Sequence, residues 1–116
     1  MVITDEELIK RGFKRYNVCN TSIDCRKYLF QKRYMNDNGD TLYFIDIYKW
    51  DWTGFPPNRI LDPYTYEITT QLYRKGDHEA INIGFGANMT IEDTETFIDS
   101  LFDAGLVEPY EYKEIN

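Results

Sequence analysis

Two short turn sequences, each between a pair of strand-like segments, restrict the fold of this chain more than any other feature. Residues 36–40 read Asn-Asp-Asn-Gly-Asp, and residues 75–78 read Lys-Gly-Asp-His. Asn and Gly tolerate the positive φ angles that tight hairpin loops require. On either side of these turns, apolar residues recur with a period of two over residues 28–35, 41–50, 64–74 and 79–85. The pattern predicts two β-hairpins.

A helix is predicted on each side of the hairpins. Thr4 and Glu7 have the spacing of a capping box, and Gly12 suits the left-handed residue that ends a helix. In the second segment Thr90 is the expected N-cap, and Gly105 is expected to end the helix. Apolar side chains recur there at steps of three and four residues, at Ile91, Thr94, Ile98, Leu101, Phe102 and Leu106.

The order of helix, two hairpins and helix predicts an α+β fold. We expect a four-stranded antiparallel sheet with the N- and C-terminal helices on one face, because an amphipathic helix must bury its apolar stripe. A chain of 116 residues has the usual size of one domain, so residues 1–116 are expected to form a single domain. Residues 53–63 contain three prolines and a glycine, and we expect them to form an ordered loop between the hairpins.

The segment 41–50 is apolar on both of its sides. One side carries Tyr43, Ile45 and Ile47, and the other carries Leu42, Phe44, Tyr48 and Trp50. Such a strand is usually covered on both faces. The second cover is expected to be the 53–63 loop, the tail at residues 110–112, or another molecule. If the cover is a second copy, the homodimer should have Phe44, Tyr48 or Trp50 in its interface.

Charge is divided along the chain. Residues 10–33 contain eight basic residues and one acid, whereas residues 76–116 contain ten acids and one lysine. The net charge is −7. This polarity favours contacts between the two regions, inside one molecule or with a partner, but it identifies no reaction.

The sequence argues against several classes of protein. No run of about 18 apolar residues occurs, and the N-terminus has acids where a signal peptide is basic, so we expect a cytoplasmic protein without a membrane segment. The single histidine, His78, and the spacing of Cys19 and Cys25 match no metal-binding pattern. We therefore expect no metal, no cofactor and no catalytic site. The cysteines are expected to be thiols, with a disulfide between them as the alternative.

Protein binding is the function that we expect. Aromatic residues and an arginine are concentrated in and after the 41–50 segment, and such residues dominate the binding energy of protein interfaces. These candidates are Phe44, Tyr48, Trp50, Trp52, Phe55 and Arg59. Acids on the polar side of the last helix would compete with a phosphate backbone for the groove of a basic protein. These candidates are Glu92, Glu95, Asp99 and Asp103.

Two other functions remain as alternatives. The basic segment 10–34 interleaves with aromatic residues such as Tyr28 and Phe30, which is typical of single-stranded nucleic-acid binding, although the net negative charge opposes it. A small enzyme that uses carboxylates alone would place Asp46 or Asp51 beside Tyr48. Two carboxylates with raised pKa values in one pocket would favour that enzyme.

The layout of the chain also carries a resemblance. A short helix ends in Leu-Ile-Lys-Arg-Gly-Phe at residues 8–13, aromatic-rich antiparallel strands follow, and an amphipathic helix comes last. In this order the chain resembles small accessory proteins that bacteriophages and prophages encode. The resemblance implies an interaction protein, since some such proteins are acidic inhibitors of host defence systems. It assigns a function to no individual residue.

Overall fold

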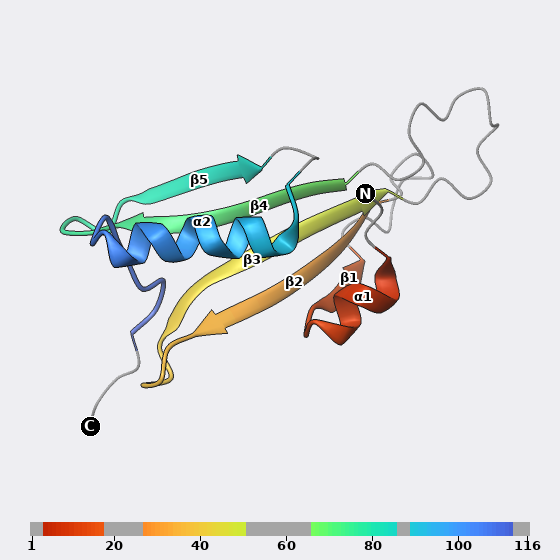
Figure 1. Ribbon diagram of the computed structural model, residues 1–116, viewed down its shortest axis with the longest axis horizontal. Coiled ribbons are helices and arrows are strands. Elements are labelled where there is room, and N and C mark those ends of the chain that lie inside the picture. Colours follow the sequence, from red (N-terminus) through yellow and green to blue (C-terminus); the bar gives the residue numbers. More distant parts are fainter. Residues whose placement is uncertain (1–3, 18–26, 51–65, 86–88, 113–116) are drawn as a thin grey trace.

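The fold is an antiparallel sheet with two helices, as Figure 1 shows. The computed structural model describes residues 4–17, 27–50, 66–85 and 89–112. In chain order the elements are α1 (Asp5–Lys10), β1 (Lys14–Asn17), β2 (Lys27–Met35), β3 (Thr41–Trp50), β4 (Tyr66–Arg74), β5 (Ala80–Phe85), α2 (Ile91–Asp103) and β6 (Val107–Glu108). The strands lie in the order β1-β2-β3-β4-β5, and β6 pairs with β4. The predicted α+β class is therefore confirmed.

The sheet has six strands, whereas four were predicted. β1 is a four-residue edge strand that pairs with β2, and its sequence Lys-Arg-Tyr-Asn lacks the apolar alternation that predicts a strand. β6 has two residues, which are too few for any periodic signal. Because β6 follows α2, the second helix is also not the last element of the chain.

Both predicted hairpins form. β2 pairs with β3, and β4 pairs with β5, in antiparallel registers. In the first turn the Asn36 side-chain oxygen accepts hydrogen bonds from the backbone N–H groups of Asn38 (3.0 Å) and Asp40 (2.9 Å). Gly39 takes a φ of +86°, which the Asn-Gly sequence had suggested. The turn residues therefore support the registers in which the hairpins pair.

The helices begin at the predicted caps, with one difference. The side chains of Thr4 and Thr90 each accept a backbone hydrogen bond from the third helical residue. At Thr90 the Asp93 side chain completes a capping box. At Thr4 the predicted box is incomplete, because the Glu7 carboxylate accepts a hydrogen bond of 3.1 Å from Arg11 instead. An arginine one turn later thus competes with the cap for this carboxylate.

The hydrophobic core lies on one face of the sheet, and both helices pack against that face (Figure 1). Leu8 of α1, Ile45 of β3 and Ile98 of α2 are fully buried in the same cluster. Arg11, just after α1, forms an ion pair with Glu92 of α2. This pair joins the basic and acidic regions of the sequence inside one molecule.

Residues 107–111 fill a space between β3 and β4. These strands pair over five residues each and then separate. Beyond that point β6 pairs with the end of β4, and Thr41 at the start of β3 exchanges two backbone hydrogen bonds of 3.0 Å with Glu111. Both pairings are antiparallel although β3 and β4 run in opposite directions, so the chain reverses around Pro109. We call residues 107–111 the hook.

Some predictions concern residues outside the described ranges. These are the 53–63 loop, Cys19, Cys25, Asp51, Trp52, Phe55 and Arg59. For Trp50 the backbone is described, at the end of β3 opposite Lys27, and its side chain is not. The described candidates are therefore those on β3 and α2.

Candidate functional site

The first group of candidate residues lies on the face of the sheet opposite the two helices. On β3, Tyr43, Ile45 and Ile47 are buried in the core, so the alternate residues point the other way. We call this surface the open face. The residues of β3 and β4 that point to it are Phe44, Asp46, Tyr48, Glu67, Thr69, Gln71 and Tyr73.

The hook covers part of the open face with an aromatic residue. The ring of Tyr110 packs edge-on against Phe44 and Tyr73, with centroid distances of 5.3 and 5.1 Å. Tyr73 also stacks on His78 at 4.2 Å, and His78 Nδ1 lies 2.7 Å from a carboxylate oxygen of Glu108. Of the covers predicted for the segment 41–50, the tail is thus the one that packs on Phe44 in the described part of the chain.

A polar row crosses the open face from strand to strand. Gln31 of β2 lies beside Asp46, and its side-chain amide donates a hydrogen bond of 2.8 Å to that carboxylate. Asp46 pairs with Thr69 of β4, which pairs with Gly84 of β5. Apart from its two chain neighbours, no described residue has an atom within 4 Å of where a Cβ on Gly84 would be. A hollow of about 360 Å³ results, and the polar side chains that line it are Asp46, Tyr48, Thr69, Gln71 and Asn82.

Asp46 is the only carboxylate among the described residues that line this hollow. Burial raises the pKa of Asp46, and the hydrogen bond from Gln31 opposes that rise. Burial also raises the pKa of the Tyr48 phenol, and the negative charges of Asp46 and Glu67 raise it further. The hollow therefore offers hydrogen-bonding groups to a small polar ligand. The carboxylate enzyme considered from the sequence needs a second carboxylate in the pocket, and Asp51 lies outside the described ranges.

The second group of candidate residues lies on α2, on the opposite side of the sheet. Glu92, Glu95, Asp99 and Asp103 follow one another at three- and four-residue steps and so share one side of the helix. Burial raises the pKa of Tyr43 on β3, and the negative charges of Asp99 and Glu95 raise it further. This side of α2 therefore faces β2 and β3. We call it the acidic side of α2.

The acids on this side differ in their surroundings. The pKa of Glu92 is lowered by a hydrogen bond from its own backbone N–H and by the Arg11 guanidinium. Glu95 lies near the Tyr34 hydroxyl, which is buried without a close hydrogen-bond partner; burial raises the pKa of Tyr34, and the charge of Glu95 adds to the rise. Asp99 and Asp103 are exposed and form no ion pair with any described residue.

The two groups of candidates cannot form one surface. Phe44 and Tyr48 lie on the open face, whereas the four acids lie above the core, and the sheet separates them. The structure thus presents a partly covered aromatic and polar surface on one side and an acidic surface on the other.

The basic residues of the 10–34 segment are also divided between the faces. Arg15 pairs with buried Phe30 and lies 4.0 Å over the ring of Tyr28, on the helix-covered side. Lys14 and Arg33 belong to the open face, because they pair with residues that point there. A single nucleic-acid strand on either face would therefore meet only part of this segment.

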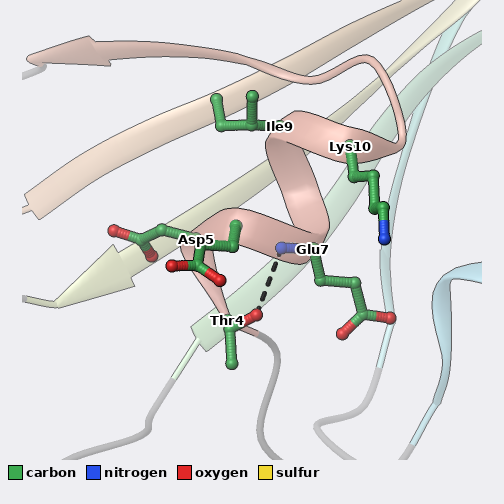
Figure 2. A pocket seen from close by; sticks show the side chains of 6 residues that line it. Thr4, Asp5, Glu7, Ile9 and Lys10 are labelled. Carbon is green, nitrogen blue, oxygen red and sulfur yellow. Dashed lines mark hydrogen bonds between the residues drawn. The ribbon is translucent and has the colours of Figure 1, made fainter.

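A larger recess of about 710 Å³ lies beside α1 (Figure 2). The described residues that line it all come from this helix and its N-cap: Thr4, Asp5, Glu6, Glu7, Ile9 and Lys10. Figure 2 shows the Thr4 oxygen accepting the backbone N–H of Glu7 at 3.1 Å, so the cap uses one of the polar groups. Binding sites usually have polar groups that converge from several elements, and a single described helix does not provide them.

No family model, curated protein or solved structure matches this chain. Among the described residues, neither helix has the length and apolar sequence needed to cross a membrane. In the same ranges, three His, Cys, Asp or Glu side chains nowhere come together as ligands for a metal ion. The function therefore has to be inferred from the two surfaces.

Sequence reasoning named Asp46 and Tyr48 but missed the other side chains of the hollow. Thr69 and Gln71 alternate with the buried residues of β4, so the period of two in the sequence is a usable signal for them. The contact between Asp46 and Gln31 could not be predicted, because it depends on the register in which β2 and β3 pair. A shift of one residue would have placed Gln31 on the other face.

Proposed function

We propose that this protein is a non-catalytic interaction protein that binds a basic protein partner through the acidic side of α2. The observation that carries the proposal is the state of Asp99 and Asp103, which are exposed and have no ion pair with a described residue. Carboxylates held on one rigid helix present a negative surface of constant shape. Such a surface selects partners rich in Lys and Arg by electrostatic complementarity.

The place of these acids along the helix supports a role in binding. The C-terminal end of a helix carries a partial negative charge, so an acid there is unfavourable for stability. Asp103 is the last residue of α2, and the last turn contains no basic residue. A side chain that opposes the helix dipole is better explained by a partner than by the stability of the fold.

The spacing of the acids suits a groove that binds a nucleic-acid backbone. Glu95, Asp99 and Asp103 follow at four-residue steps, which correspond to about 6 Å along a helix axis. Consecutive phosphates along one DNA strand are a similar distance apart, about 7 Å, because each step combines a rise of about 3.4 Å with a rotation around the helix axis. Competition with nucleic acid for a basic groove is accordingly the mode of inhibition that we propose, in line with the resemblance to phage accessory proteins.

The charge of the whole molecule supports the same kind of partner. A net charge of −7 attracts a basic protein before contact and speeds association. This long-range term is screened over about 8 Å at physiological salt, so binding should weaken as salt is added.

A titration with a lysine-rich peptide tests the proposal. Backbone amide NMR spectra of the labelled protein are recorded while an oligolysine of about 12 residues is added. We expect the largest shifts between Glu95 and Asp103. Asp99→Asn combined with Asp103→Asn should weaken the affinity on the order of tenfold, or about 1.4 kcal/mol, because both unpaired carboxylates are lost.

The matched control is Asp37→Asn combined with Glu111→Gln. It removes the same charge from exposed residues outside α2. We expect it to change the affinity less than about twofold, since distant exposed charges are screened. Equal weakening by both double variants would mean that overall charge alone attracts the peptide, and the proposed site would then be wrong.

A further inference from the structure

β5 forms one edge of the sheet, and its outer backbone groups have no partner among the described residues. The Arg74 N–H donates a hydrogen bond of 2.8 Å to the Glu79 carbonyl, so the backbone groups of Glu79 point toward β4. Backbone groups alternate in direction along an antiparallel strand. Those of Ala80, Asn82 and Gly84 therefore point away from β4, to the free edge.

This edge lacks the features that usually prevent a further strand from pairing. β5 reads Ala-Ile-Asn-Ile-Gly-Phe, without charge or proline, and its pairing with β4 is regular over all six residues. On the opposite edge, β1 has Lys14 and Arg15 in two of its four positions. Charged residues, prolines and bulges protect strand edges in natural proteins. Of the two edges, β5 is thus the one open to another strand.

Apolar side chains continue from this edge onto α2, which runs along the same part of the sheet (Figure 1). Ile81 is 38% exposed although it points to the helix-covered face, and Phe97 of α2 is 43% exposed. Phe97 packs edge-on against Phe85 with a centroid distance of 5.8 Å. Leu101 lies one turn further along the same side of the helix. We call β5 and this side of α2 the apolar edge.

We propose that the apolar edge binds a second copy of this chain, with the two β5 strands antiparallel in one continuous sheet. A two-fold axis perpendicular to the sheet keeps all helices on one face, so paired residues must point to the same face. A register with Ile83 on the axis meets this condition, because residues at equal distances before and after Ile83 point to the same face. Asn82 then lies opposite Gly84 of the second copy, and their outward N–H and C=O groups bond to each other. Ile81 lies opposite Phe85 of the second copy, where apolar surface is exposed.

Charge distinguishes a second copy from a basic partner as the occupant of this edge. Each copy has a net charge of −7, so two copies repel wherever their acids approach each other. The apolar edge brings together uncharged strands, and it leaves Asp99 and Asp103 on the far side of each helix. A basic partner would instead be attracted to the acidic side of α2. The dimer therefore does not depend on the proposed function, and the two can be tested separately.

Sedimentation velocity and hydrogen exchange on the intact chain test the proposal. Between about 1 and 200 μM we expect the mass to rise to twice that of the monomer. The amides of Asn82 and Gly84 have no partner among the described residues of one copy, so they should become protected only in the dimer. Phe97→Lys should raise the dimer Kd at least about tenfold, because it adds a charge to the apolar edge. Separately, Asn82→Pro should raise the Kd by at least about the same factor, because it removes an outward N–H that bonds to the second copy.

Ile9→Lys is the matched control, because Ile9 is an exposed apolar residue on α1, away from the edge. It should leave the dimer Kd unchanged, and circular dichroism confirms that each variant is folded. A monomer throughout this concentration range would overturn the proposal. So would a dimer that neither edge variant weakens, or one in which Asn82 and Gly84 still exchange rapidly.

Discussion

Gly105 ends α2 through its backbone conformation. Its φ is +71°, and its N–H bonds to the carbonyl of Phe102 at 3.0 Å. The next N–H, of Leu106, bonds to the carbonyl of Leu101 at 3.1 Å. These bonds satisfy two of the carbonyls that every helix leaves free at its C-terminus. Leu106 is 57% exposed, so the hydrophobic contact that often accompanies this motif contributes little here.

Gly105→Ala should lower the free energy of unfolding by about 1 kcal/mol, because a Cβ is strained in the left-handed region. Urea denaturation measures the change. Gly84→Ala is the control, since Gly84 lies in a strand without a positive φ and has open space around its Cβ position. If the two variants lose equal stability, the conformation of Gly105 is not the cause.

Asp46 should make the protein less stable as pH rises. Burial raises its pKa in the folded state, so the fold favours the protonated carboxyl. Below the unfolded pKa of about 3.9 both states are protonated and the residue has no effect. As the pH rises from the unfolded pKa through the folded pKa, the carboxyl ionises more readily in the unfolded state than in the folded state, and the free energy of unfolding decreases. Asp46→Asn should therefore gain stability relative to wild type between about pH 3 and pH 7.

Urea denaturation at both pH values checks this prediction. Asp37→Asn, on the exposed first hairpin turn, is the control and should not show the gain. If Asp46→Asn follows the wild-type pH profile, burial does not disfavour the charged form of Asp46 in the folded protein.

The hook stabilises the sheet through Tyr110, which contacts Phe44 and Tyr73 at once. Tyr110→Ala should lower the free energy of unfolding by about 2 kcal/mol, since each aromatic pair adds roughly 0.5–1.5 kcal/mol beyond burial. Thermal or urea denaturation measures the loss. Tyr112→Ala should cost less than about 0.5 kcal/mol, because Tyr112 is 55% exposed. A Tyr110 variant as stable as the Tyr112 variant would show that the hook is only loosely attached.

Helices and strands with a periodic sequence pattern were predictable. Segments that are extended only because they pair with a neighbouring strand were not. The four predicted strand segments agree with β2, β3, β4 and β5 within two residues, and both helices were found. β1 and the hook pair because β2, β3 and β4 present backbone groups to them. Their own sequences carry no strand signal, so only the three-dimensional arrangement reveals them.

For the candidate residues, too, the sequence pattern predicted positions within an element but not the arrangement between elements. Alternation along β3 correctly separates Phe44 and Tyr48 from the core residues, and helical spacing correctly gathers the four acids on one side of α2. Spacing within an element could not show that the sheet lies between these two groups. That relation depends on which face the helices cover, and this is a property of the assembled fold.

Across the whole molecule, charge and apolar surface are separated around α2. Its acidic side faces β2 and β3 and includes Glu92, which pairs with Arg11 at the end of α1. Its other side continues into β5 through Phe97. The division of charge seen along the sequence is thus partly neutralised inside the fold, and among the residues that the structure describes this ion pair is the one that joins the two regions. What remains is an acidic surface beside an uncharged edge, so the proposed partner and the proposed second copy would not compete for the same residues.

The hook also has a consequence for the order of synthesis. A ribosome releases β3 and β4 well before residues 107–111, so the nascent chain has both strands in place while the space between them is still empty. The backbone groups of Thr41 and Tyr73 that later pair with the hook stay open to water, or to a chaperone, during that interval. Folding of this sheet is therefore completed only after translation has passed α2.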